Sequence, residues 1–148
     1  MNDKLVHTQI SGKFNAYNLI AVYAVSDILG LDQSKSIELL SKIKPVEGRF
    51  QVISKNGITG IIDFAHTPDA IEKVLVSVKD YIKSDGVIIT VVGCGGGRDK
   101  EKRNKMGNVL SELSDLTIFT SDNPRNEDPN QIIEDLSLIH ICRCRRAL

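Results

Sequence analysis

The side chains best suited to chemistry stand on one short segment, Thr117–Pro129, which reads TIFTSDNPRNEDP. A brief apolar run is followed at once by Asp122, Asn123 and Arg125. Arginine offers a planar fork that binds a carboxylate through two hydrogen bonds, aspartate attracts an ammonium group, and Pro124 stiffens the backbone between them. The pattern indicates a loop that binds a zwitterion, and the ligand it implies is an amino acid.

The same letters also fit a structural interpretation without a ligand. Asn-Pro is typical of turns, and Asp128 followed by Pro129 is typical of the N-cap and first residue of a helix. The sequence alone leaves both interpretations open.

A second candidate is the glycine-rich segment from Val91 to Arg103, VVGCGGGRDKEKR. Glycines allow a backbone to approach an anion closely, and several cations follow them. However, the dinucleotide fingerprint would need glycine where Arg98 stands, and the segment lacks the Gly-Lys-Ser/Thr ending of a P-loop. Nucleotide binding by this loop is therefore weakly supported, and an ion pair between Arg98 and Asp99 is a structural alternative.

Alternating elements must position these loops. Residues 16–29 are nearly all apolar or small and predict a buried helix, and a second helix should run from Asp32 or Ser34 to Pro45. Two strands around Asn56-Gly57 predict a hairpin. Next come a helix from Thr67-Pro68, a strand at 87–92 covered on both faces, a helix at 103–113, a strand at 117–120 and a helix from Pro129. This order predicts an α/β fold with a doubly wound open sheet, in which ligand groups gather at the carboxyl ends of the strands.

Five segments resemble the Mur ligases that add meso-diaminopimelate to the peptidoglycan precursor UDP-MurNAc-L-Ala-D-Glu. The two loops above match that family's Asp-Asn-Pro-Arg and Gly-Gly-x-Arg-Asp-x-x-Lys-Arg motifs. Residues 62–69, IDFAHTPD, match its Asp-Tyr-Ala-His-Thr-Pro segment, with Phe64 in place of the usual tyrosine. Residues 12–18, GKFNAYN, and 45–50, PVEGRF, complete a set that keeps the family's order.

The resemblance implies two groups of site residues. Those expected to bind meso-diaminopimelate are Arg98, Asp122, Asn123, Pro124 and Arg125. Those expected to bind ATP are Asn15, Asn18, Arg49, Asp63 and His66. Structural alternatives stay open for the second group: helix capping for the asparagines, a surface ion pair for the arginine, and anchoring of a turn for the histidine.

The resemblance also divides the chain. Residues 1–44 are expected to be the last helices of a central ATPase domain, and residues 45–136 an incomplete C-terminal, amino-acid-binding domain with a Rossmann-like open sheet. Residues 137–148, SLIHICRCRRAL, break with the preceding helix pattern without a turn signal. We expect this tail to be non-native, with a genuine basic arm as the alternative.

By the same resemblance, the parent protein is an ATP-dependent amide ligase of peptidoglycan synthesis. It would use ATP and Mg²⁺, act on UDP-MurNAc-L-Ala-D-Glu and meso-diaminopimelate, and work as a cytoplasmic monomer. The family's P-loop, metal-binding acids and carbamylated lysine have no match here, so no catalytic or metal-binding residue is assigned, and the 148-residue chain should be inactive alone. The alternatives are a ligase of the folylpolyglutamate synthase or cyanophycin synthetase type, a stand-alone amino-acid-binding domain, and an inert truncated product.

Composition narrows the classes further. The formal net charge is zero, and without the three arginines of the tail 16 basic residues face 19 acidic ones, a net charge of minus 3. No basic stripe with interleaved aromatics and no apolar run of about 18 to 20 residues occurs, which argues against nucleic-acid binding and a membrane span. The first residues lack the basic and then apolar plan of a secretory signal. The three cysteines form neither a zinc quartet nor a disulfide framework.

Overall fold

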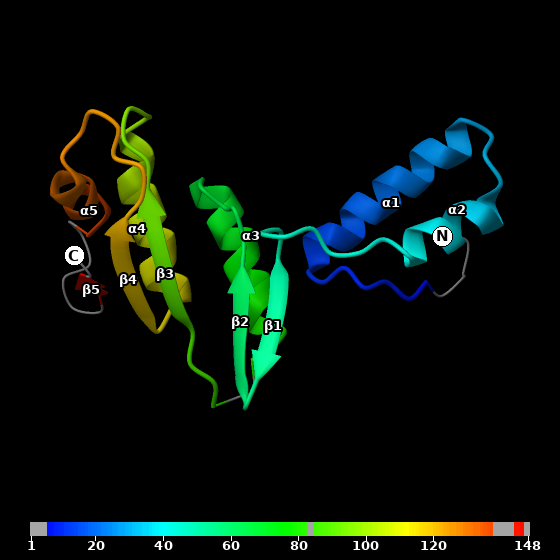
Figure 1. The fold of residues 1–148 in the computed structure, drawn as a ribbon, viewed down its shortest axis with the longest axis horizontal. Coiled ribbons are helices and arrows are strands. Elements are labelled where there is room, and N and C mark those ends of the chain that lie inside the picture. The colour runs from blue at the N-terminus through cyan, green and yellow to red at the C-terminus, as the bar shows by residue number, and fades with distance from the viewer. Residues whose placement is uncertain (1–5, 83–84, 138–143, 147–148) are drawn as a thin grey trace. The chain divides into compact units, whose positions relative to one another are not determined.

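The computed structural model describes residues 6–82, 85–137 and 144–146. Contacts within the chain divide it into two compact units, an N-terminal unit of residues 1–64 and a C-terminal unit of residues 65–148 (Figure 1). The predicted domain division at residue 45 stays a prediction. No helix in the described ranges is long and apolar enough to cross a membrane.

The N-terminal unit contains two helices and a hairpin. Helix α1 is Lys13–Ile28 and helix α2 is Gln33–Ser41, whose N-cap is Asp32, because its carboxylate accepts from the backbone N–H of Lys35 at 2.7 Å. Strands β1, Gln51–Lys55, and β2, Ile58–Ile62, pair antiparallel. They are joined by Asn56 and Gly57, which both have positive φ (52° and 78°), the geometry that a two-residue hairpin turn favours. The predicted helices and hairpin are confirmed.

The expectation that the first helix is buried is wrong within this unit. Only Leu19 and Tyr23 of α1 are buried, and they pack with Leu40 of α2. Four other apolar side chains of α1 are 50% to 84% exposed: Ile20, Val22, Val25 and Ile28. The reason is geometric, because the nine-residue α2 can cover only one side of the 16-residue α1.

The C-terminal unit alternates helices and strands, as predicted. In chain order its elements are α3 (Pro68–Lys79), β3 (Ile89–Cys94), α4 (Glu101–Leu113), β4 (Leu116–Ser121), α5 (Pro129–Ser137) and β5 (Cys144–Arg146). The strands lie side by side in the order β3-β4-β5, all parallel, with α4 behind β3 and β4 in Figure 1. Strand β5 falls in the predicted tail, whose residues 138–143 and 147–148 lie outside the described residues. A non-native origin for that tail stays a prediction.

Strand β3 differs from its prediction in position and in burial. It begins and ends two residues later than expected, because its pairing with β4 runs from Ile89 opposite Leu116 to Cys94 opposite Ser121. Its outer face is also uncovered in this unit, where Ile89 and Val91 are 58% and 63% exposed. Parallel crossovers are right-handed, so helices between strands laid down in one direction fall on the same face of the sheet. The progression β3-β4-β5 therefore leaves the other face open.

The covered face holds the core. Helices α3, α4 and α5 meet the sheet in one apolar cluster, whose members include Leu75, Met106, Leu110, Phe119 and Leu136. Phe119 of β4 and Leu110 of α4 are fully buried. This cluster fixes the sheet that presents the loops following β3 and β4.

Phe119→Ala should lower the free energy of unfolding by about 3–5 kcal/mol, because it empties a fully buried site between sheet and helices. Val91→Ala on the neighbouring strand should cost less than about 1 kcal/mol, because that side chain is largely exposed. Urea unfolding followed by circular dichroism measures both. Equal losses in the two variants would contradict the one-sided core.

Candidate functional site

Two loops meet at the carboxyl edge of the parallel sheet. One follows β3 and contains Gly95–Lys100, and the other follows β4 and contains Asp122–Asp128. Because β3 and β4 are paired neighbours that run in the same direction, their following loops emerge beside each other. We call the first the glycine loop and the second the arginine loop.

Hydrogen bonds join the two loops directly. The backbone N–H of Gly96 donates to the carbonyl oxygen of Asn123 at 2.9 Å. The guanidinium of Arg125 donates to the carbonyl oxygen of Gly96. The next N–H, of Gly97, donates to the carboxylate of Glu127 at 2.6 Å. Three consecutive backbone groups of the glycine loop are thus held by the arginine loop.

The glycines are required by this close contact. A side-chain carbon at Gly96 would lie 1.9 Å from the carbonyl oxygen of Pro124, far inside any permitted separation. One at Gly95 would lie 3.0 Å from Nη1 of Arg125, the far end of a flexible side chain. These two glycines therefore serve the packing of one loop on the other, which agrees with the weak sequence support for a phosphate cradle.

Arg125 has an unusual backbone for its residue type, with φ at 51°. Its N–H donates to Oδ1 of Asn123 at 3.3 Å, so this asparagine side chain is engaged within the loop. Its side chain is exposed, and the bond to Gly96 uses only one of the five guanidinium donors. The geometry leaves donors of Arg125 available to a carboxylate in solution.

Arg98 is exposed and makes no hydrogen bond or ion pair with any other described residue. The alternative of a pair with Asp99 is not what forms, because Asp99 instead accepts from the backbone N–H of Glu101 at 2.9 Å, at the start of α4. Asp122 is exposed as well. Among the exposed charges of the two loops are thus the guanidinium groups of Arg98 and Arg125 and the carboxylate of Asp122, which suit a zwitterion with a carboxylate.

The structural interpretation of Asp128 holds beside this chemistry. Its carboxylate accepts from the backbone N–H of Asn130 at 2.9 Å, and α5 begins at Pro129. The arginine loop therefore ends as a capped helix, which anchors its far side.

The sequence analysis missed the most buried charged group of the site, Arg103. Its side chain is fully buried and donates to Glu127 at 2.9 and 3.0 Å and to Asp135 at 2.8 Å. A signal was present in the sequence. Arg103 shares the helical spacing of Met106 and Leu110, which places a cation on the apolar stripe of α4.

These contacts shift the charge equilibria of all three groups. Hydrogen bonds from Arg103 and from the Gly97 N–H lower the pKa of Glu127 from 4.5 to about 2, and Lys100 contributes at 3.3 Å. The bond to Glu127 raises the pKa of the Arg103 guanidinium. Burial works against ionisation of Asp135, but bonds from Arg103 and Gln131 still leave its pKa lowered. All three groups are therefore charged at neutral pH.

Two residues predicted to bind ATP, Arg49 and Asp63, lie close to Phe50 in the N-terminal unit. The carboxylate of Asp63 accepts from the backbone N–H of Phe50 at 2.8 Å, which supports the positive φ of 46° there. The guanidinium of Arg49 lies over the ring of Phe64, 5.2 Å from its centre. Phe14 of α1 meets the Phe50 ring edge-on at 5.5 Å. Arg49 thus stacks on the residue that replaces the family's tyrosine.

The remaining predicted ATP residues are engaged locally. The side-chain amide of Asn15 donates to the carbonyl oxygen of Ser11 at 2.7 Å, and that of Asn18 donates to Asn15 at 3.3 Å. His66 is exposed, belongs to the C-terminal unit, and accepts from Nζ of Lys102 through its carbonyl oxygen at 3.3 Å. The residues predicted to bind the amino acid therefore all lie in the C-terminal unit. Those predicted to bind ATP are divided between the two units.

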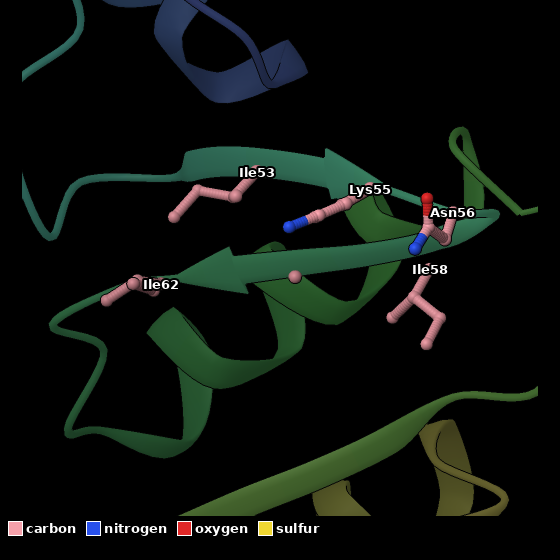
Figure 2. A pocket seen from close by; sticks show the side chains of 6 residues that line it. Ile53, Lys55, Asn56, Ile58 and Ile62 are labelled. Atoms are coloured by element: carbon pink, nitrogen blue, oxygen red, sulfur yellow. The ribbon is translucent and has the colours of Figure 1, made fainter.

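A shallow hollow of about 410 Å³ lies on one face of the hairpin, and no predicted site residue lines it. Figure 2 shows its lining side chains along the two strands. The residues are Ile53, Lys55, Asn56, Ile58, Gly60 and Ile62. None of these residues belongs to the glycine loop or the arginine loop.

The fold and the loop pair define an α/β domain with exposed charged side chains at the carboxyl edge of a parallel sheet. A family model described as "Mur ligase, glutamate ligase domain" matches residues 48–147, and the chain belongs to the Mur ligase family. The family resemblance inferred from five motifs is confirmed.

Several individual proteins and solved structures of this family are similar to the chain. A protein of Parabacteroides distasonis named UDP-N-acetylmuramoyl-L-alanyl-D-glutamate--2,6-diaminopimelate ligase is 47% identical over 137 residues, 92% of this chain and 28% of the relative. A solved structure of a ligase with the same name is 34% identical, with a TM-score of 0.64 over 96% of this chain and 29% of its own. The folylpolyglutamate synthase of Thermotoga maritima, at 23% identity and a TM-score of 0.67 over 95% of this chain and 32% of its own, shares the fold. The chain spans less than a third of each.

Gly96→Ala should destabilise the C-terminal unit by about 1–3 kcal/mol, because the new carbon meets backbone of Pro124 that cannot yield cheaply. Gly95→Ala is the matched control and should change stability by less than about 1 kcal/mol, because only the tip of Arg125 must move. Chemical unfolding of both variants tests the difference. Indistinguishable stabilities would show that the loops are not packed as described.

Low pH should destabilise the C-terminal unit, because it protonates the carboxylate of Glu127. The folded-state pKa of Glu127 lies below its ordinary value, so its ionised form stabilises the fold fully above about pH 4.5, and this contribution is lost as the pH falls towards 2. The melting temperature should therefore fall across this window, and less steeply in Glu127→Gln, with Asp135 accounting for the remainder. Thermal melts from neutral to acid pH measure it. Parallel curves for the two proteins would refute the assignment.

Proposed function

We propose that this chain is the part of an ATP-dependent amide ligase that receives meso-diaminopimelate, for addition to UDP-MurNAc-L-Ala-D-Glu in peptidoglycan synthesis. The observation that supports it best is the pair of exposed guanidinium groups, Arg98 and Arg125, beside Asp122 on two interlocked loops. Meso-diaminopimelate has an amine and a carboxylate at both ends. One end can therefore be held by these charges while the amine of the other end reacts.

The same loops explain selectivity against L-lysine. Lysine lacks the second carboxylate, so a guanidinium that pairs with that group would be left without its partner. Arg125 is exposed in this unit, so we expect a moderate discrimination, about 10- to 100-fold, equivalent to about 1.4–2.8 kcal/mol. Asn123 and Pro124 act here by shaping the turn that presents the arginine.

In the proposed reaction, bound ATP supplies the phosphoryl group that activates the acceptor carboxylate, and Mg²⁺ would accompany it. The amine of the bound amino acid then attacks the carbonyl carbon of the activated carboxylate. A C–N bond forms, the C–O bond to phosphate breaks, and the amine releases a proton. The task of this chain is to orient the amine. Positioning of this kind accounts for a large share of the rate in ligation chemistry.

The N-terminal unit offers groups that fit the edge of a nucleotide. Arg49 over Phe64 provides a cation and an aromatic face, and Asp63 provides a carboxylate for a hydroxyl group. We propose that Asn15, Asn18 and His66 complete this edge. No P-loop sequence is present and no cluster of metal ligands occurs among the described residues, so the chain by itself should not release phosphate. We further propose that the whole enzyme is a cytoplasmic monomer.

The proposal can be tested by transplanting residues 12–137 into the Parabacteroides distasonis relative in place of its own matching segment. The chimaera should release phosphate only when ATP, UDP-MurNAc-L-Ala-D-Glu and meso-diaminopimelate are all present. A folded chimaera that lacks this activity, or phosphate release by the isolated 148-residue chain on addition of the amino acid, would overturn the proposal.

In that chimaera, Arg125→Ala should raise KM for meso-diaminopimelate by about 10- to 100-fold and reduce the preference over L-lysine by a similar factor. KM for ATP should change little, because the hydrogen bonds of this residue in the described structure are with the glycine loop and with its own loop. Lys73→Ala, which removes an exposed cation paired with Asp69 on α3, is the control and should leave both values unchanged. If Arg125→Ala kept the same preference for meso-diaminopimelate over L-lysine, another group would have to bind the second carboxylate.

A further inference from the structure

One carboxylate, that of Glu127, holds three separate parts of the C-terminal unit together. It receives two hydrogen bonds from the buried Arg103 of α4, at 2.9 and 3.0 Å. It also receives the backbone N–H of Gly97 at 2.6 Å and lies 3.3 Å from Nζ of Lys100. A side chain only two positions after Arg125 therefore fixes both the glycine loop and the start of α4.

The backbone of Glu127 also shapes the arginine loop. Its N–H donates to the carbonyl oxygen of Pro124 at 3.0 Å, which closes a tight turn with Arg125 inside it. Arg125 has a positive φ in this turn, and its guanidinium is bonded to Gly96, the neighbour of Gly97. Glu127 is therefore connected to Arg125 in two ways, through the turn of the arginine loop and through the neighbouring residues Gly96 and Gly97.

Asp135 bonds to the same arginine, and its hydrogen bonds to Arg103 and Gln131 do not involve either loop. It lies on α5 and accepts from Arg103 at 2.8 Å and from Gln131, on the same helix, at 3.0 Å. Both carboxylates are mostly buried in similar degree, with side chains 17% and 22% exposed. Arg103 therefore bonds to two carboxylates, and among the described residues Glu127 is the one that also bonds to the glycine loop.

Charge balance gives Glu127 a second effect. A carboxylate beside a site for a carboxylate ligand would normally repel it, but the charge of Glu127 is matched by Arg103 and Lys100. Without those cations, the same group could compete with the ligand for Arg98 or Arg125. The ion pair thus keeps an acidic side chain in the site without loss of its positive character.

We propose that Glu127, anchored by Arg103, is a positioning residue that preorganises the glycine and arginine loops for the carboxylate of the incoming amino acid. The proposal rests on the proposed function for the identity of that ligand. A loop held before binding loses less conformational entropy when the ligand arrives, so affinity improves without a new contact to the ligand. Neither Glu127 nor Arg103 needs to touch the substrate.

The test compares Glu127→Gln with Asp135→Asn in the chimaera described above. Each variant neutralises one carboxylate that pairs with Arg103 and keeps the size of the side chain. Both variants should therefore melt at a lower temperature. Glu127→Gln should raise KM for meso-diaminopimelate about tenfold and leave KM for ATP within about twofold. Asp135→Asn should leave both KM values within about twofold.

A second readout requires no activity. In the isotope-labelled 148-residue chain, the amide proton of Gly97 should exchange with solvent faster in Glu127→Gln than in Asp135→Asn, because only the first change alters its acceptor. Equal exchange in both variants, or equal KM values, would overturn the positioning role. Arg125→Ala separates the two proposals: an unchanged KM there would refute the amino-acid site itself, whatever Glu127→Gln does.

Discussion

The C-terminal unit depends on the bonding of Arg103 to Glu127. A guanidinium that is fully buried must be paired, because an isolated charge in the interior is far less stable than one in water. Glu127 provides two hydrogen bonds to it and Asp135 a third. A buried pair of this kind adds little net stability compared with apolar side chains. Its value here is geometric, since the partners come from α4 and from a loop that starts after β4.

The pairing of Arg103 with Glu127 helps to hold the glycine loop and the arginine loop together. The sheet brings them to the same edge, but parallel strands alone do not fix the conformation of the segments that follow. Close approach is possible because Gly96 lacks a side chain, and the contact is then locked through Gly97 and Glu127. Rigid loops with charged tips are suited to a small zwitterion, whose binding depends on a few well-placed charges.

Both units carry uncovered apolar side chains. Side chains such as Val25 of α1 and Val91 of β3 are more than half exposed. The chain spans 28% of the length of the Parabacteroides distasonis relative, so most of that protein has no counterpart here. Contiguous exposed apolar side chains typically mark places where another protein surface packs.

The amino-acid sequence by itself determined the local features of this protein. Asn56-Gly57 specified the hairpin, Asp32 and Thr67 capped their helices, and apolar periodicity set the alternation of helices and strands, because each depends on residues close together in the chain. Tertiary structure decided the rest. The burial of Arg103, the contact that requires Gly96, and the open face of β3 all depend on residues more than twenty positions apart or on the order of strands in the sheet. Local propensity does not encode such pairings. The motifs therefore indicated the candidate ligand-binding side chains, whereas only the packing revealed what holds them in place.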